Sequence, residues 1–185
     1  MVGNWGMIDL DTPQELYTKA DYVTGQQWEL VFSDEFNQDG RSFYPGDDPY
    51  WEAVDLHYWQ TNNMEWYDPA ALTTKGGALH VTLSRKDTHE LQYEGGMMTT
   101  WNKFCFTGGL VETSVVLPGI NNVVGLWPAI WTMGNLGRAG YGASLEGMVR
   151  HRSDPMRHHA NIDARQFSGH TRMIPATWVQ SPTKP

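Results

Sequence analysis

The sequence predicts an all-β protein, folded as an antiparallel sandwich or barrel of short strands. Apolar and polar residues alternate in several segments, which is the period of a half-buried strand. Clusters rich in Gly, Pro, Asn and Asp separate these segments and are typical of turns, as in "YPGDDP", "TKGG" and "LPGINN". Helical patterns are scarce, so the frequent turns favour antiparallel neighbours.

The helix-like segment "TPQELYTKA", residues 12–20, comes first in the chain. Thr12 is expected as its N-cap, with Pro13 in the first helical position and Glu15 in the third. The strands then follow in "WELVFSDEF" (28–36), "GALHVTLSRK" (77–86) and "GGLVETSVVLP" (108–118). Alternation in these three segments predicts one buried face and one face toward water.

A fourth strand is expected in "GLWPAIWTMG", residues 125–134. Alternation gives it two apolar faces, one of which carries Trp127 and Trp131, so it is expected in the middle of a sheet. Pro128 argues against a central position because it cannot donate a hydrogen bond to a neighbouring strand. Two interpretations of the tryptophans stay open: packing in the core, or a platform on which the C–H face of a sugar ring stacks.

Charge and aromatic residues divide the chain near Met148. Residues 149–185 hold six of the 13 basic and two of the 21 acidic residues, so they carry +4 and residues 1–148 carry −12. The first part also holds all but two of the nine Trp, eight Tyr and six Phe. Such an acidic part repels nucleic acid and anionic membranes, which leaves uncharged partners such as sugars open. Cys105 is the single cysteine, so no disulfide can form within the chain.

Four long segments carry a resemblance to a known family. They are residues 28–59, "TNNMEWYDPAALTTKGGALHVTLS" (61–84), residues 93–119 and "GLWPAIWTMGNLGRAGYGASLEGM" (125–148). These segments closely resemble the fungal β-1,6-glucan synthesis-associated proteins, which belong with the family 16 glycoside hydrolases. The resemblance implies a concanavalin-like jelly-roll β-sandwich of two antiparallel sheets, a glucan cleft on its concave face and a role in building the fungal cell wall.

The resemblance also implies where catalytic residues would lie. Retaining β-glucanases need a carboxylate nucleophile and a carboxylic acid about 5 Å apart. In the wider family a Glu-x-Asp-x-Glu strand supplies both, and it follows a Trp-Pro pair shortly after the region matching "GLWPAIW". Here that place holds "VRHRSDPMRHHANIDARQ", residues 149–166, without the pair or the spacing. We therefore expect a chain truncated or diverted after Met148, whose catalytic residues are unknown.

Four residues are candidates for substrate binding: Trp127, Trp131, Trp101 and Glu112. Glu112 lies on the polar face of its predicted strand, where it either borders the cleft or is simply solvated. Trp101 in "TTWNKF" has the same two interpretations as the other tryptophans.

Other polar residues are weighed as alternatives. Asn62, Asn63 and Glu65 in "TNNMEWYDP" offer groups either for sugar contacts or for a turn and sheet edge. Asp34 and Glu35 are expected on opposite faces of their strand, which excludes them as a facing catalytic pair if the strand is regular.

The segment after Met148 is expected to be an unrelated, basic, His-rich and disordered tail. Its histidines, His151, His158, His159 and His170, invite a zinc interpretation, but no Cys accompanies them and their spacing fits no fixed ligand set. We expect no metal and no cofactor. A shifted reading frame or a retained intron is the favoured explanation of the tail.

The sequence thus predicts an N-terminal extension (1–27), a partial family 16-like glucan-binding or hydrolase domain (28–148) and the tail (149–185). The expected function is biosynthesis and organisation of cell-wall β-glucan, hydrolase- or transglycosylase-like, with the catalytic strand missing. The alternatives are a non-catalytic glucan-binding or scaffold module and a non-functional truncated product. The resemblance implies a place in the secretory pathway, plasma membrane or cell surface of a fungus, where family members are usually membrane-anchored. We expect no membrane span or signal peptide in this chain, because no segment reaches about 20 apolar residues.

Overall fold

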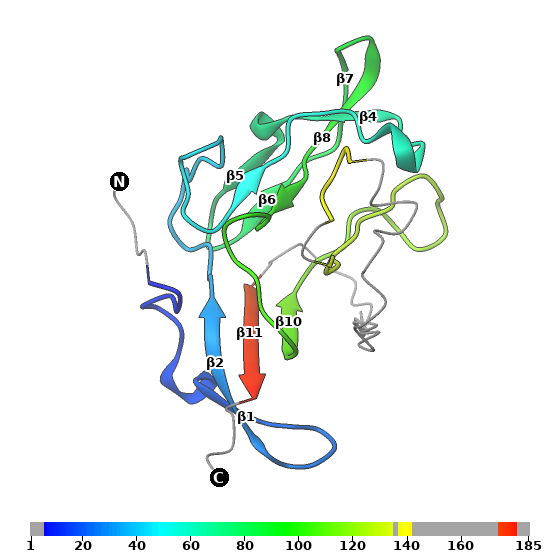
Figure 1. Cartoon of the computed structure of the whole chain (residues 1–185). Helices are drawn as coiled ribbons and strands as arrows, with labels where there is room; N and C mark the ends of the chain where they lie inside the picture. The colour runs from blue at the N-terminus through cyan, green and yellow to red at the C-terminus, as the bar shows by residue number, and fades with distance from the viewer. Residues whose placement is uncertain (1–5, 135–136, 142–173, 181–185) are drawn as a thin grey trace.

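The computed structural model describes residues 6–134, 137–141 and 174–180 (Figure 1). The regular elements of these residues are short strands and three single-turn 3-10 helices. In chain order they are η1 (Gln14–Leu16), β1 (Thr18–Ala20), β2 (Gln27–Ser33), β3 (Glu52–Ala53), η2 (Trp59–Thr61), β4 (Glu65–Tyr67), η3 (Pro69–Ala71), β5 (Leu72–Thr74), β6 (Leu79–Val81), β7 (Ser84–Thr88), β8 (Leu91–Gly95), β9 (Met98–Thr99), β10 (Leu110–Ser114) and β11 (Ile174–Gln180). The predicted all-β class is confirmed.

The largest sheet has four strands in the order β1-β2-β11-β10, and each neighbouring pair is antiparallel. Figure 1 shows β2, β11 and β10 side by side in the lower part of the molecule, below the strands β4 to β8. Those upper strands form the antiparallel pair β5–β6 and the three-stranded sheet β4-β8-β7. Within that small sheet β4 and β8 run parallel, whereas β7 and β8 form an antiparallel hairpin.

Strand β2 follows the predicted alternation. Leu30 and Phe32 are buried, whereas Gln27 and Glu29, nearer the start of the strand, are exposed. Leu30 packs with the partly buried Trp28. The hydrophobic face of this strand therefore forms as the sequence predicts.

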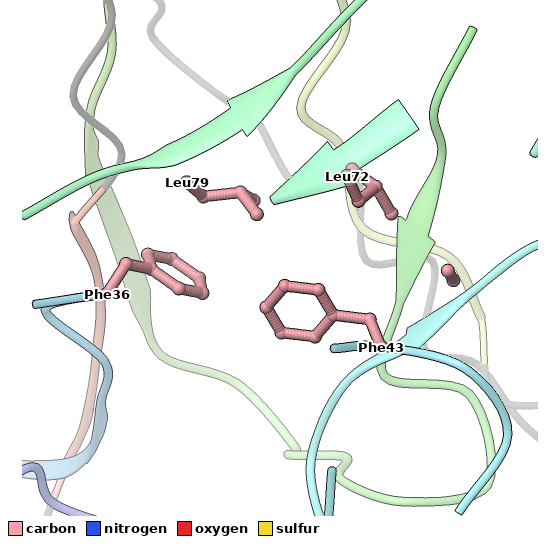
Figure 2. Packing of buried hydrophobic residues seen from close by; sticks show 5 residues of the cluster. Phe36, Phe43, Leu72 and Leu79 are labelled. Carbon is pink, nitrogen blue, oxygen red and sulfur yellow. The ribbon is translucent and has the colours of Figure 1, made fainter. Parts of the chain in front are cut away.

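The main core lies between the loop after β2 and the pair β5–β6. It contains Phe36, Phe43, Leu72 and Leu79, together with Ala53 (Figure 2). Phe36 and Phe43 meet edge to face, with ring centroids 6.4 Å apart. Phe36 is fully buried although its φ is +50°, a left-handed value that is uncommon for a bulky residue.

Two predicted elements differ from the structure. The helix expected over residues 12–20 is limited to η1, because the chain enters β1 at Thr18 and pairs with β2. Thr12 does not cap it, since its hydroxyl donates to Glu35 Oε1 at 2.8 Å. The strand expected over residues 77–86 is divided into β6 and β7, and Val81 at its centre is 48% exposed.

The central strand predicted over residues 125–134 is wrong, because the structure has no strand there. The positive φ of Gly125, +127°, turns the chain where an extended residue was expected. The two apolar faces of this segment therefore do not enter a sheet.

Strand β11 corrects the expectation of a wholly disordered tail. Ile174–Gln180 pairs with β2 on one side and with β10 on the other, so it completes the four-stranded sheet. Its sequence, "IPATWVQ", has the apolar residues Ile174, Ala176 and Trp178 at every second position, which is the period that a strand requires. The predicted boundaries at residues 27/28 and 148/149 stay predictions.

Candidate functional site

An exposed turn brings Arg138 and Tyr141 together. The Tyr141 amide donates to the Arg138 carbonyl oxygen at 3.3 Å, which closes the turn over residues 138–141. Gly140 in this turn has a φ of +76°, and a Cβ added there would lie 2.9 Å from Leu56 Cδ2. A residue with a side chain would be strained and would collide with Leu56, so the turn needs glycine at this position.

The Arg138 guanidinium lies over two aromatic rings. Its central carbon is 5.1 Å from the ring centroid of Trp101 and 4.2 Å from that of Tyr141. Both distances are within the range of a cation–π contact. Trp101 is 43% exposed and Tyr141 is 41% exposed, so each ring also offers apolar surface to the solvent. We call these three residues the Trp101 platform.

The Trp101 platform is connected through Leu56 to a second group of polar residues. Leu56 and Tyr67 exchange two backbone hydrogen bonds, of 3.1 and 2.9 Å, in an isolated antiparallel bridge. Near Tyr67, the Asn63 amide nitrogen donates to Glu65 Oε1 at 3.0 Å. The backbone N–H of Met64 donates to the other oxygen of Glu65 at 3.1 Å.

Two side-chain oxygens of this region are buried and have no hydrogen-bond partner, namely Gln60 Oε1 and Asn63 Oδ1. Buried amide oxygens are normally satisfied, because leaving one without a donor costs about 1–3 kcal/mol. Each of these two can accept a hydrogen bond from a donor such as a hydroxyl group or water. We call Gln60, Asn63, Glu65 and Tyr67 the amide cluster.

Burial raises the pKa of the Tyr67 hydroxyl to about 12, and the negative charge of Glu65 adds to this effect. The unfolded chain ionises its tyrosines near pH 10. Between pH 10 and 12 the unfolded state therefore loses the Tyr67 proton while the folded state keeps it, which favours unfolding.

We accordingly expect the free energy of unfolding of the wild-type protein to fall more steeply from pH 10 to pH 12 than that of Tyr67→Phe. Urea denaturation followed by circular dichroism at several pH values measures the two slopes. Equal slopes would show that Tyr67 ionises alike in the folded and unfolded chains.

The four sequence-predicted binding residues have separate sets of contacts in the structure. Trp101 belongs to the Trp101 platform, as described above. Trp127 is 92% exposed and Trp131 is also exposed, both outside any strand. Glu112 lies on β10, where it forms an ion pair with Lys19 and accepts a 3.5 Å hydrogen bond from Tyr22. Their roles in binding stay predictions.

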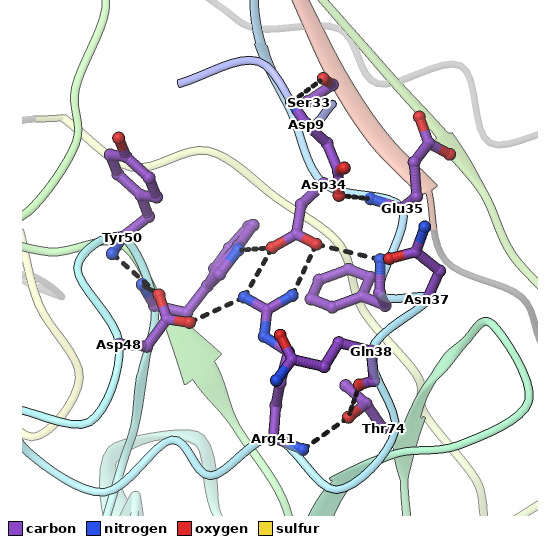
Figure 3. A network of polar contacts seen from close by, with 12 residues as sticks. Asp9, Ser33, Asp34, Glu35, Asn37, Gln38, Arg41, Asp48, Tyr50 and Thr74 are labelled. Atoms are coloured by element: carbon purple, nitrogen blue, oxygen red, sulfur yellow. Dashed lines mark hydrogen bonds and ion pairs between the residues drawn. The ribbon is translucent and has the colours of Figure 1, made fainter. Parts of the chain in front are cut away.

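The buried charges lie elsewhere, around Arg41 (Figure 3). Its guanidinium donates to both carboxylate oxygens of Asp34, at 2.7 and 2.9 Å, and to Asp48 at 2.7 Å. Trp51 Nε1 also donates to Asp34 at 2.8 Å. Burial acts to lower the pKa of Arg41, but the two carboxylates outweigh it and the pKa is raised. In Figure 3 Asp34 points to Arg41 whereas Glu35 points away, so these two acids do not face each other.

Two further expectations concern metal ions and membranes. Within residues 6–134, 137–141 and 174–180, no group of three or more His, Cys, Asp or Glu side chains is placed to hold a metal ion. In the same part of the chain no helix has the length and apolar character needed to cross a membrane. The tail histidines 151, 158, 159 and 170 lie outside the described residues.

The sequence pointed to some residues of these sites but not to others. Asn63 and Glu65 were weighed as candidates, but Gln60, Arg138 and Tyr141 were missed. The glycines within "LGRAGYG" mark a turn and were the available signal for Arg138 and Tyr141. No periodic pattern could show that this turn packs on Leu56.

The chain is similar to proteins of β-glucan synthesis. Residues 2–155 match the family described as "Beta-glucan synthesis-associated protein SKN1/KRE6/Sbg1". Over 142 residues the chain is 52% identical to "Beta-glucan synthesis-associated protein KRE6" of Saccharomyces cerevisiae, which covers 77% of this chain and 20% of that protein. Over 143 residues it is 51% identical to "Beta-glucan synthesis-associated protein SKN1" of Candida albicans, covering 77% of this chain and 19% of that protein.

A solved structure similar to the chain is the laminarinase from Rhodothermus marinus. The TM-score is 0.43 and the sequence identity 27%, over 49% of this chain and 36% of the laminarinase. The chain spans about a fifth of the length of the curated relatives named above.

Proposed function

Because the chain belongs to the SKN1/KRE6/Sbg1 family of beta-glucan synthesis-associated proteins, we propose that it binds β-glucan during synthesis and organisation of the fungal cell wall. The observation that carries this proposal is the family match over residues 2–155. The named relatives from two yeasts support a place in the secretory pathway or at the cell surface. Membrane anchoring of the complete protein is part of the same proposal.

The Trp101 platform and the amide cluster supply the two kinds of contact that a glucan needs. The C–H face of a glucose ring is apolar and stacks on aromatic rings such as Trp101 and Tyr141. Glucose hydroxyls donate hydrogen bonds, which the unpartnered oxygens of Gln60 and Asn63 can accept once these buried side chains turn toward the surface. The turn that carries Arg138 packs on Leu56, and Leu56 pairs with Tyr67, so the two groups share one structural support.

The charge of the chain favours a neutral ligand. Residues 1–148 carry a net charge of −12, so an acidic polysaccharide would be repelled whereas a β-glucan would not. Neutral glucan binding therefore fits both the composition and the exposed aromatic rings.

Several acidic residues of the described part of the chain are engaged in ion pairs. Asp34 and Asp48 are engaged by Arg41, and Glu112 is engaged by Lys19. A glycosidase needs one carboxylic acid and one carboxylate on either side of the glycosidic bond. The carboxylates named here are neutralised by cations instead, which suits structural roles.

We expect Trp101→Ala to weaken the binding of a β-1,3- or β-1,6-linked glucohexaose by about fivefold or more, because a lost stacking ring costs on the order of 1 kcal/mol. Trp127→Ala should also weaken binding more than Trp28→Ala does. Isothermal titration calorimetry on the purified chain measures all three affinities.

Trp28→Ala is the matched control, since Trp28 packs against Leu30 in the sheet. Only variants with a circular dichroism spectrum like that of the wild type are compared. Equal losses at all three positions would contradict stacking on Trp101 and Trp127, and no binding by the wild-type chain would contradict the proposed function.

A further inference from the structure

Arg138 occupies part of the ring surface that the proposed glucan site would use. Its guanidinium carbon lies 5.1 Å from the Trp101 ring centroid and 4.2 Å from that of Tyr141. A sugar ring that stacks on an aromatic face occupies the same layer of space above the ring. A guanidinium and a sugar therefore exclude each other from one ring face.

We propose that Arg138 is an affinity-determining residue that competes with glucan for the Trp101 platform, an inference that rests on the proposed glucan binding. In the ligand-free protein the guanidinium takes the place of the sugar. Glucan binds after the Arg138 side chain leaves the rings, so the measured affinity is reduced by the free energy of the contacts that Arg138 makes with them.

The structure allows the Arg138 side chain to leave without unfolding the turn. The turn is closed by a backbone hydrogen bond from Tyr141 to Arg138 and is supported by the contact of Gly140 with Leu56. Neither contact involves the Arg138 side chain, which is exposed. A change of side-chain rotamer can therefore move the guanidinium off both rings without opening the turn.

Competition and direct sugar contact predict opposite effects of removing Arg138 on the affinity for glucan. If Arg138 donated hydrogen bonds to bound glucan, its removal would weaken binding. If Arg138 competes for the rings, its removal strengthens binding. Exposed cation–π contacts are weak, so the expected gain is about two- to fivefold in affinity.

The test measures binding of a β-1,3-linked and a β-1,6-linked glucohexaose to the full chain by isothermal titration calorimetry. Arg138→Ala is expected to bind about two- to fivefold more tightly than wild type, and Arg138→Gln likewise. Arg138→Lys keeps a cation that can lie over the rings, so its gain should be smaller. Arg85→Ala is the matched control, because Arg85 is an exposed arginine on β7 whose loss changes the net charge equally.

A second arm repeats the comparison in a Trp101→Ala background. There the Arg138→Ala gain should shrink, because one of the two contested rings is absent. Binding by wild type with no gain, or a loss, in both Arg138→Ala and Arg138→Gln overturns the competition and leaves the proposed function standing. Binding by Arg138→Ala alone supports both proposals, whereas no binding by any variant overturns both.

Discussion

Replacing Arg41 with alanine is expected to lower the free energy of unfolding by about 3–5 kcal/mol, the usual cost of removing one partner from a buried ion pair. Arg41 bonds to both oxygens of Asp34 and to Asp48, and the Asp48 side chain is only 1% exposed. The variant would leave two buried carboxylates without their cation. Urea denaturation monitored by circular dichroism measures the change.

Two further variants make the Arg41 result specific. Arg41→Lys should recover only part of the stability, because an ammonium group cannot donate to Asp34 and Asp48 with the planar geometry of a guanidinium. Arg85→Ala, which removes an exposed arginine, should change stability by no more than about 0.5 kcal/mol. A loss at Arg41 as small as that at Arg85 would contradict the buried cluster.

The Arg41 cluster illustrates which features sequence reasoning reaches. Strand β2 was predicted because Trp28, Leu30 and Phe32 recur at every second residue, and this period is visible in the local sequence. Arg41 and its partners Asp34 and Asp48 are spaced at seven residues in loops. Their meeting depends on how the chain folds back after β2, which no local period encodes.

The segments that were predicted wrongly failed for related reasons. Residues 125–134 have the composition of a central strand, but a strand also needs neighbours with free hydrogen-bonding groups, and these are not local information. Ile174–Gln180 alternates correctly, yet the basic, His-rich residues before it favoured disorder. Pairing with β2 and β10 outweighs that composition.

For the candidate site, residue types were more informative than positions. Tryptophan suggested stacking on sugars, and Trp101 does lie in an exposed aromatic group with Arg138 and Tyr141. The sequence could not indicate that an arginine from a distant turn would cover that ring. Nor could it show that Asn63 would have an unpartnered oxygen, since hydrogen-bond satisfaction depends on the packed structure.

Phe36→Ala is expected to lower the free energy of unfolding by about 3–5 kcal/mol, as is typical for a buried phenylalanine reduced to alanine. Phe36 is fully buried and meets the rings of Phe43 and Trp51, at centroid distances of 6.4 and 5.9 Å. Truncation would remove these contacts and leave a cavity beside Leu79 in the core cluster. The same urea denaturation measures the loss.

Because of the backbone conformation at Phe36, glycine should destabilise the protein less than alanine at this position, which reverses the usual order. Its φ of +50° is strained for alanine but not for glycine. The Asp34 carboxylate stabilises this turn by accepting a hydrogen bond from the Phe36 backbone N–H at 3.0 Å. Phe36→Gly should therefore be more stable than Phe36→Ala by about 1 kcal/mol. At Phe43, which is not among the residues with positive φ, Phe43→Gly should be less stable than Phe43→Ala by about 0.5–1 kcal/mol. Both pairs create nearly equal cavities, so a difference of the same sign at the two positions would refute the left-handed conformation of Phe36.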